Sequence, residues 1–449
     1  MFRKITLSVT LLLLGGAAMA QNPIIRDQFT ADPSALVVGD RIYVFPSHDI
    51  PAPDDFPRKD WFCMGDYHVF SSENLTDWTD HGVILDQKDV PWGNPKGYSM
   101  WAPDCAEKNG KYYFFFPDFM KSDGKPGRFS PFRAGVAVAD RPEGPYTPRE
   151  TPIEGVFGID PCIFVDDDGQ GYLVWPARGI NIAKLNDDWS QLAEEPTPVG
   201  NLPSPGLIEG PYLFKANGKY YMTFPWARKD TEVLAYSMAD NIYGPYEFKG
   251  VFFEEWPNKC WTNHHSIVNF KDQWYIFYHH NAYSPDFDKN RSACANSLFF
   301  EADGSIRMVK PTLRGIGITR AESDIQIDRY SAISEAGAAI AYLDTTYYFA
   351  GWKTVFTSPD AWVQYNTVQF DGDCRGAVLR VNAPKGGMLL LQSGNKTIAK
   401  VKVPVTEGWK EIPVRIRGIE KGIHHLTVSS LSPNVTHVDW LRFSKKAKP

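Results

Sequence analysis

The sequence predicts an all-β protein of two domains, a five-bladed β-propeller over residues 22–316 followed by a β-sandwich of jelly-roll type over residues 317–445. Three observations support this prediction. One strand–turn–strand pattern occurs five times, helical periodicity is sustained nowhere, and short alternating strands replace the repeat near the C-terminus. A supersecondary unit that recurs along a chain indicates radially arranged or stacked units, each too small to bury its own apolar faces.

Each copy of the repeat begins with a polar or turn residue, continues as an apolar strand, turns tightly and ends in an aromatic-rich strand. The turns read Gly-Asp, Asn-Gly, Asp-Gly or Lys-Asp, which is typical of β-hairpins. The tyrosine after each turn recurs at separations of 70, 59, 49 and 54 residues, which suit four-stranded blades with variable outer loops. The five copies span residues 31–47, 101–118, 159–176, 208–225 and 263–280.

The start of each copy supplies the candidate site. The innermost strand of every blade lines the axis of a propeller, so equivalent positions converge there. Counting back 11 or 12 residues from each tyrosine reaches three carboxylates, a histidine and an indole: Asp32, Asp160, Glu209, His264 and Trp101. One acidic residue in such a place is usually a turn residue. Its repetition at a common offset favours a functional site at one end of the axis.

The chemistry of three neighbouring carboxylates points to sugar hydrolysis. When groups of like charge lie close together, their pKa values move apart. Two carboxylates of different pKa are what glycoside hydrolysis needs, one as proton donor to the leaving oxygen and one to activate water or attack carbon. Aromatic side chains could stack on the sugar, although each is as often a core residue. The candidates are Trp61, Trp92, Trp101, Trp226 and Trp261.

The order of the short motifs resembles glycoside hydrolase family 43 over residues 22–316. The motifs are Asp32-Pro33, Trp101-Ala102-Pro103-Asp104, Ile159-Asp160-Pro161, Glu209-Gly210-Pro211 and His264-His265-Ser266. The resemblance implies a five-bladed propeller that inverts the anomeric centre. It makes Asp32 the general base, Glu209 the general acid, and Asp160 the residue that tunes and orients the acid.

The resemblance also assigns residues around the substrate. Arg291 matches the arginine that the family places near the sugar, the alternative being an exposed ion-pairing arginine. His264 matches the histidine beside an axial calcium, which it would bind through water, and His265 competes for this assignment. We therefore expect calcium and no organic cofactor. The expected substrate-binding residues are Trp101, Arg291, Trp226 and Trp61.

The C-terminal segment is predicted to be a sandwich because its strands alternate in polarity and are separated by Gly, Pro and Asn turns. It resembles a carbohydrate-binding module of family 6. The resemblance implies a structural calcium held by Glu322 and Asp439, with aromatic residues that hold sugar. Trp352 and Trp409 are the candidates, and the segment departs from the family pattern at His437, where such a module has an asparagine.

The first twenty residues predict export. Arg3 and Lys4 precede an apolar run and an Ala-Met-Ala cleavage pattern, so residues 1–20 read as a secretory signal peptide and the mature chain as periplasmic or extracellular. No other segment is apolar enough to span a membrane. Without the leader the formal charge changes from −6 to −8, and no basic block favours nucleic acid as a partner. The six cysteines are scattered along the chain, so the sequence allows one or two disulfides without specifying them.

The leading functional prediction is an inverting glycosidase of plant cell-wall polysaccharide or oligosaccharide, either an α-L-arabinofuranosidase or a β-D-xylosidase. A family 43 enzyme of different specificity, such as an arabinanase or a galactosidase, is a second hypothesis. Two non-catalytic hypotheses are a carbohydrate-binding propeller and a structural propeller that binds proteins. The presence of all three carboxylates disfavours both of these binding proteins.

Overall fold

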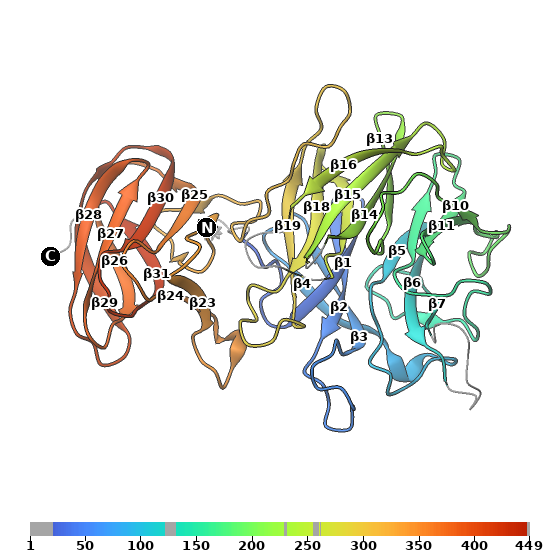
Figure 1. Cartoon of the computed structure of the whole chain (residues 1–449), viewed down its shortest axis with the longest axis horizontal. Coiled ribbons are helices and arrows are strands. Elements are labelled where there is room, and N and C mark those ends of the chain that lie inside the picture. Colours follow the sequence, from blue (N-terminus) through green and yellow to red (C-terminus); the bar gives the residue numbers. More distant parts are fainter. Residues whose placement is uncertain (1–20, 122–131, 229–230, 255–259, 261, 447–449) are drawn as a thin grey trace, which may run out of the picture.

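The computed structural model describes residues 21–121, 132–228, 231–254, 260 and 262–446. It has two lobes (Figure 1), and both are built from strands. Within the described residues the only helical elements are two short 3-10 helices, η1 (Gln87–Asp89) and η2 (Tyr348–Ala350). No helix in this part of the chain has the length and apolar character that crossing a bilayer requires. The predicted all-β class is confirmed.

The larger lobe is a five-bladed propeller, as predicted, and in each blade the strands pair with their sequence neighbours in antiparallel order. The first blade contains β1 (Phe29–Val38), β2 (Arg41–Asp49), β3 (Met64–Ser72) and β4 (Thr79–Asp86). The second contains β5 (Asp104–Lys108), β6 (Lys111–Phe119), β7 (Phe132–Ala139) and β8 (Thr147–Pro148). The third contains β9 (Cys162–Val165), β10 (Gly171–Pro176), β11 (Ile180–Lys184) and β12 (Thr197–Pro198).

The last two blades complete the ring. The fourth contains β13 (Tyr212–Ala216), β14 (Lys219–Arg228), β15 (Thr231–Ala239) and β16 (Glu247–Phe253). The fifth, as far as the structure describes it, contains β17 (His265–Phe270), β18 (Gln273–His280) and β19 (Ser292–Leu298). Each of the five repeats found in the sequence therefore spans the first hairpin of one blade.

Aromatic residues are frequent in these strands because both faces of each blade are buried against a neighbour. Phe114 and Phe116 of β6 pack toward the first blade, where Phe114 lies 5.9 Å from the Phe45 ring. Tyr113 and Phe115 alternate with them and pack toward the third blade. This period of two follows from the pleat of a strand. Similar clusters fill the other blade interfaces.

Hydrogen bonds close the ring and tie the blades together near the axis. The Ile24 N–H donates to Ala293 O over 2.9 Å, and the Thr30 N–H donates to Arg291 O over 2.9 Å, so the N-terminal segment joins the fifth blade to the first. The buried Asp104 carboxylate accepts from the Ser34 hydroxyl at 2.5 Å and from the Ile163 N–H at 2.8 Å. It therefore connects the first three blades.

The smaller lobe is a sandwich of two six-stranded sheets. One sheet contains β20 (Thr319–Arg320), β22 (Ala332–Ile333), β25 (Trp362–Phe370), β27 (Gly387–Ser393), β28 (Lys396–Val403) and β30 (Gly422–Ser430). The other contains β21 (Ile325–Gln326), β23 (Ala338–Tyr342), β24 (Trp352–Phe356), β26 (Cys374–Asn382), β29 (Lys410–Ile419) and β31 (Thr436–Ser444). Inward-facing residues of both sheets form one core.

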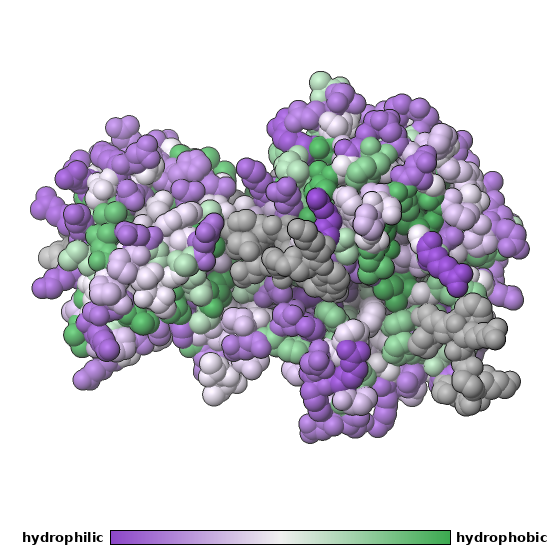
Figure 2. Space-filling view, viewed as in Figure 1, coloured by the Kyte–Doolittle hydropathy of each residue, from purple (hydrophilic) through white to green (hydrophobic). Residues whose placement is uncertain are grey.

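The two lobes share a hydrophobic core at their junction. Phe29, Tyr283 and Leu313 of the propeller belong to the same buried cluster as the sandwich interior. The indole N–H of Trp352 donates to Tyr283 O over 2.8 Å, and the two rings lie 4.8 Å apart. Trp352 is thus a junction residue rather than a sugar platform. On the face that Figure 2 shows, hydrophilic residues cover much of both lobes.

All six cysteines lie in the described part of the chain, each is buried, and none forms a disulfide. The disulfides that the sequence left open are therefore absent from this fold. Cys374 is the one cysteine of the smaller lobe, and its thiol donates to the Glu322 carboxylate over 3.8 Å. Burial raises the pKa of the Cys374 thiol to about 11, so it stays protonated.

Candidate active site

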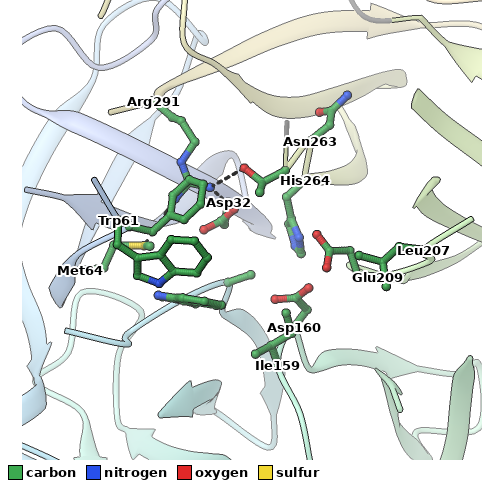
Figure 3. Close-up of a pocket in the computed structure, with 14 residues that line it drawn as sticks. Asp32, Trp61, Met64, Ile159, Asp160, Leu207, Glu209, Asn263, His264 and Arg291 are labelled. Atoms are coloured by element: carbon green, nitrogen blue, oxygen red, sulfur yellow. Dashed lines mark hydrogen bonds and ion pairs between the residues drawn. The ribbon is translucent and has the colours of Figure 1, made fainter. Parts of the chain in front are cut away.

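A cavity of about 200 Å³ opens at one end of the propeller axis. Most of the side chains that line it come from the segments where the inner strands start and from the loop between β2 and β3, and Arg291 lies directly before β19. Figure 3 shows the carboxylates of Asp32, Asp160 and Glu209 facing one another around His264. The lining residues are Asp32, Trp61, Phe62, Met64, Trp101, Ala102, Ile159, Asp160, Leu207, Glu209, Thr262, Asn263, His264 and Arg291. The structure thus brings together the five residues found at equivalent repeat positions.

The backbone turns two of the carboxylates toward this cavity. Asp32 and Asp160 have φ angles of 49° and 54°, in the left-handed region that residues other than glycine rarely adopt. Asp32 also lies where the pairing of β1 with β2 shifts register between Ala31 and Ser34. A bulge re-aims side chains and interrupts the regular alternation of a strand. Backbone strain of this kind gathers at functional sites, where the surrounding fold holds it in place.

Asp32 is held as a carboxylate. Its Oδ1 lies 3.3 Å from Arg291 Nη1, its Oδ2 accepts from the Ser47 hydroxyl at 2.9 Å, and its backbone N–H donates to His279 Nδ1 over 3.0 Å. Burial alone would raise its pKa. The charge of Arg291 and the contact with His279 outweigh burial and hold the pKa of Asp32 below its ordinary value. The residue is therefore ionised near neutral pH.

Arg291 is fixed by a second carboxylate that the sequence analysis missed. Asp49, at the end of β2, accepts from Arg291 Nε at 3.0 Å and from Nη2 at 2.9 Å, which is the bidentate arrangement that suits a guanidinium. Arg291 is 3% exposed and Asp49 is 2% exposed, so the alternative of a surface ion pair is excluded. Asp49 lies two residues beyond the first copy of the repeat (residues 31–47), and only its ion pair with Arg291 reveals its role.

Glu209, which is half-buried, and Asp160, which is buried, are two acids whose pKa values depend on each other. Burial, and then the charge of Asp32, raises the pKa of Glu209 to about 7. Burial and the charge of Glu209 also raise the pKa of Asp160. The Gly210 N–H donates to Asp160 Oδ2 over 3.1 Å, which favours the ionised form of that carboxyl. The pair therefore retains a proton near neutral pH.

A fourth acid, Glu232 of β15, lies behind this pair. Its side chain is fully buried, hydrogen-bonds to Glu209 and adds its charge to those that raise the pKa of Asp160. The sequence analysis missed Glu232 because it belongs to the third strand of the fourth blade and not to the repeated strand start.

The predicted aromatic residues have different surroundings. Trp61 and Trp101 line the cavity, and Trp101 packs against Phe132 with ring centroids 4.7 Å apart. Trp92 is a core residue stacked on Phe116 at 5.8 Å. Trp226 is half-buried and donates from its indole N–H to Pro205 O over 3.2 Å, and it is not among the residues that line the cavity. Trp261 lies outside the described residues.

The two adjacent histidines face different surroundings. His264 lines the cavity, and burial lowers its pKa to about 4, so its ring is neutral near pH 7. His265 is 1% exposed and its Nε2 lies 2.7 Å from the Thr223 hydroxyl, within the core. Ca²⁺ prefers oxygen ligands, so the His264 ring fits a calcium ion only through intervening water.

The predicted calcium ligands of the smaller lobe have other partners. The Asp439 carboxylate pairs with the Arg380 guanidinium, and Glu322 accepts from the Cys374 thiol. A cation at Asp439 would have to displace Arg380, so this pair does not fit a calcium ion as it stands. Trp409 is half-buried beneath Arg380, whose guanidinium lies 5.0 Å from the ring centroid.

A five-bladed propeller with one ionised and one protonated carboxyl facing each other across a small axial cavity defines a glycoside hydrolase. A scan against family models identifies which one: residues 20–306 match the model of Glycosyl hydrolases family 43. The chain belongs to this family, as the sequence motifs indicated.

Curated proteins and solved structures support the assignment. Xylosidase/arabinosidase 43A of Humicola insolens is 38% identical over 338 residues, 64% of this chain and 99% of the relative. The structure of CoXyl43, a family 43 β-xylosidase/α-arabinofuranosidase from a compost microbial metagenome bound to xylotriose in a calcium-free form, is 35% identical with a TM-score of 0.57, over 65% of this chain and 98% of that one. An arabinoxylan arabinofuranohydrolase structure from Bacillus subtilis covers 95% of this chain and 97% of its own, with 23% identity and a TM-score of 0.54, so it shares the fold of both lobes.

Proposed function

We propose that the protein is an exo-acting, inverting glycosidase that removes terminal β-D-xylosyl or α-L-arabinofuranosyl units from plant cell-wall oligosaccharides or polysaccharides. The observation that carries the proposal is the pair of acids in opposite protonation states, Asp32 below and Glu209 above its ordinary pKa, in one small cavity. A site of this kind can give a proton to one face of a glycosidic bond and take one from the other.

In the proposed mechanism, the ionised Asp32 accepts a proton from a water molecule as that water attacks the anomeric carbon. The protonated Glu209 gives its proton to the glycosidic oxygen as the bond to the anomeric carbon breaks. The sugar leaves with inverted configuration, and both carboxyls end in the opposite protonation state. Exchange with solvent restores them.

The remaining acids keep these two in their working states. Asp160 is anchored by the Gly210 N–H and, beside Glu209, belongs to the pair of acids that retains a proton near neutral pH. Arg291 has the opposite effect on Asp32, because its positive charge lowers the pKa of that carboxyl and keeps it ionised. We assign Asp160 the role of tuning and orienting the acid, and Arg291 the role of holding the base and contacting the sugar.

Two features favour exo action. The inner cavity is small enough for about one sugar ring, and Trp61 and Trp101 line it. Glu209, Trp101, Ile159 and Leu207 also line a second, wider depression outside it. The acid therefore lies between the two spaces, as expected for the proton donor to a bond that joins a terminal sugar to its leaving group. Trp226, which lines neither space, is a weaker candidate for sugar contact.

The sugar specificity rests on the relatives. The Humicola insolens protein is called a xylosidase/arabinosidase, and the metagenomic structure is that of a β-xylosidase/α-arabinofuranosidase. Xylopyranose and arabinofuranose can present similar hydroxyl geometry to one pocket, so a dual activity is consistent with a single cavity.

The test uses aryl β-D-xylopyranoside and aryl α-L-arabinofuranoside, with proton NMR of the released sugar at early times. We expect release of the inverted anomer and its loss in Glu209→Gln. Retained configuration would contradict the roles of Asp32 and Glu209. A protein that binds oligosaccharides without turnover would instead be a non-catalytic binding propeller.

Two further proposals concern calcium and location. A water-bound calcium beside His264 would raise kcat, and a chelator followed by calcium addition tests this proposal. Residues 1–20 lie outside the described residues, and we propose that they direct export to the periplasm or the medium. N-terminal sequencing of the protein from culture should then begin at Gln21.

A further inference from the structure

A second cluster of metal-binding side chains lies in the first blade, away from the catalytic cavity. His48 of β2 and Asp66 and His68 of β3 each offer one ligand atom, and these atoms lie within 4.8 Å of one another. Within the described residues this is the one group of three or more His, Cys, Asp or Glu side chains so arranged. None of the three lines the catalytic cavity.

The alternation of β2 places this cluster on the opposite face from the catalytic groups. Ser47 and Asp49, on either side of His48, bind Asp32 and Arg291. His48 therefore points the other way, where it meets the next strand (Figure 1 shows β2 beside β3). His68 stacks on the Phe70 ring at 5.9 Å, and Phe70 packs toward the fifth blade. The cluster thus lies near the interface of the first and fifth blades.

The distances within the cluster suit a shared cation. His48 Nδ1 lies 2.9 Å from Asp66 Oδ1, and His68 Nε2 lies 3.6 Å from the same oxygen. The two imidazole rings have centroids 5.1 Å apart and are nearly perpendicular. Zn²⁺ binds imidazole nitrogen and carboxylate oxygen at about 2.0–2.2 Å, so small side-chain rotations would bring all three atoms onto one ion.

A second carboxylate orients one of the histidines. Asp80 Oδ1 lies 3.2 Å from His68 Nδ1, the ring nitrogen that faces away from Asp66. Gln28 Nε2 donates to Asp80 Oδ2 over 3.3 Å. A carboxylate on the outer nitrogen of a ligating histidine fixes the tautomer that leaves the other nitrogen free to bind metal. A hydrogen-bonded surface pair would not need this second carboxylate.

We propose that His48, Asp66 and His68 form a binding site for a divalent transition-metal ion, with Zn²⁺ as the ion that its ligands fit best. Two imidazoles and one carboxylate suit zinc and its first-row neighbours better than calcium or magnesium, which prefer oxygen. The side chains are 14–24% exposed, so an ion can enter from solvent and keep a water as its fourth ligand. This site is distinct from a calcium at His264.

An ion here would stabilise the folded propeller. It would join β2 to β3 near the register shift between Ser47 and Asp49, and any ligand that binds only the folded chain raises the free energy of unfolding. None of the three ligands lines the catalytic cavity, so zinc is expected to raise Tm without being required for turnover.

The test uses the full chain treated with chelator and then titrated with ZnCl₂ by calorimetry, with Tm followed by circular dichroism. We expect saturable binding of one ion per chain and a higher Tm. His68→Gln should abolish both effects, and Asp80→Asn should weaken binding by about 10- to 100-fold, as loss of an orienting carboxylate does elsewhere.

His81→Gln is the matched control. His81 follows Asp80 in β4 and lies 2.8 Å from the Ser71 hydroxyl, outside the cluster, so zinc binding should be unchanged. If His68→Gln fails to fold, Asp66→Asn takes its place. An anomalous zinc peak between His48 and His68 in soaked crystals would support the proposal. Equal zinc binding by His68→Gln and the unaltered protein, or a peak only at the catalytic cavity, would overturn it.

Discussion

At the scale of single residues, the site works because burial and charge act in opposite directions on two carboxyls. Asp32 and Glu209 are both largely withdrawn from water, yet only Asp32 lies beside the Arg291 guanidinium. The arginine supplies the difference, and Asp49 holds the arginine in place. The protonation states that the proposed reaction needs are therefore set by one buried cation and its neighbours.

These pKa directions predict the shape of the pH–rate profile. Glu209 must be protonated to act as an acid, so kcat/KM should fall as pH rises through about 7, the raised pKa of Glu209. Asp32 must be ionised, and its lowered pKa should keep the enzyme active well into the acidic range. A pH–rate profile on an aryl xyloside checks both limbs. An alkaline limb that persists in the residual activity of Glu209→Gln would assign it to another group.

Asp49→Asn should destabilise the protein and impair catalysis. The change leaves Arg291 buried with half of its counter-charge, and breaking a buried ion pair costs about 3–5 kcal/mol. A guanidinium no longer held by two bonds would also shift against Asp32. Urea unfolding and kcat/KM measure the two effects. Asp140→Asn, which breaks the exposed pair with Lys111, is the control and should change stability by less than about 1 kcal/mol. Equal effects of the two substitutions would contradict this account.

At the scale of elements, the chain departs from regular β structure near the start of the inner strand in three of the blades. Asp32, Asp160 and Gly210 all have positive φ angles there. Each departure either aims a side chain at the axis or turns an N–H toward a carboxylate, as Gly210 does toward Asp160. The regular hairpins that follow provide the rigid support for these turns.

Gly210→Ala should disturb the site directly. Gly210 has a φ of 47°, and a Cβ there would lie 2.6 Å from His264 Nδ1. Both the backbone strain and the clash would move the Gly210 N–H that donates to Asp160. We therefore expect kcat to fall by about tenfold or more and the free energy of unfolding to fall by about 1 kcal/mol or more. Steady-state kinetics and thermal unfolding measure these losses.

Gly218→Ala is the matched control for this substitution. Gly218 has a φ of 72° at the tip of the same hairpin, with open space where the Cβ would lie. It shares the backbone strain but not the clash, so stability should fall while kcat stays unchanged. A similar loss of kcat in both variants would show that the clash with His264 is not the cause of the loss.

At the scale of the whole molecule, the smaller lobe is part of the propeller's structural support. The cluster that fills the sandwich extends to Phe29, Tyr283 and Leu313, and Tyr283 also binds the N-terminal segment through Asn22 O at 3.1 Å. The same segment closes the ring of blades. The predicted domain boundary at residue 316 therefore separates two sets of strands whose cores are continuous.

Trp352→Ala should weaken this junction without touching the catalytic cavity. Replacing a buried tryptophan costs about 3–5 kcal/mol, so Tm should fall and the two lobes should unfold in separate calorimetric transitions. The kcat/KM for aryl xylosides should change by less than about twofold, since Trp352 is absent from the cavity lining. Trp409→Ala, in the same lobe but outside the junction cluster, should keep one transition. A single transition in Trp352→Ala would show that the lobes are coupled by other contacts.

The sequence alone determined the five-bladed fold, the sandwich and the convergence of Asp32, Asp160, Glu209, Trp101 and His264, because a repeat places equivalent positions on one axis. Tertiary structure alone decided the roles of Asp49, Glu232 and Trp352, which lie outside the repeated strand start. It also decided that Trp92 is core and that Arg380 pairs with Asp439. The physical reason is that a repeat specifies position along each blade, whereas burial, charge pairing and metal-binding groups arise between segments that only the folded chain brings together.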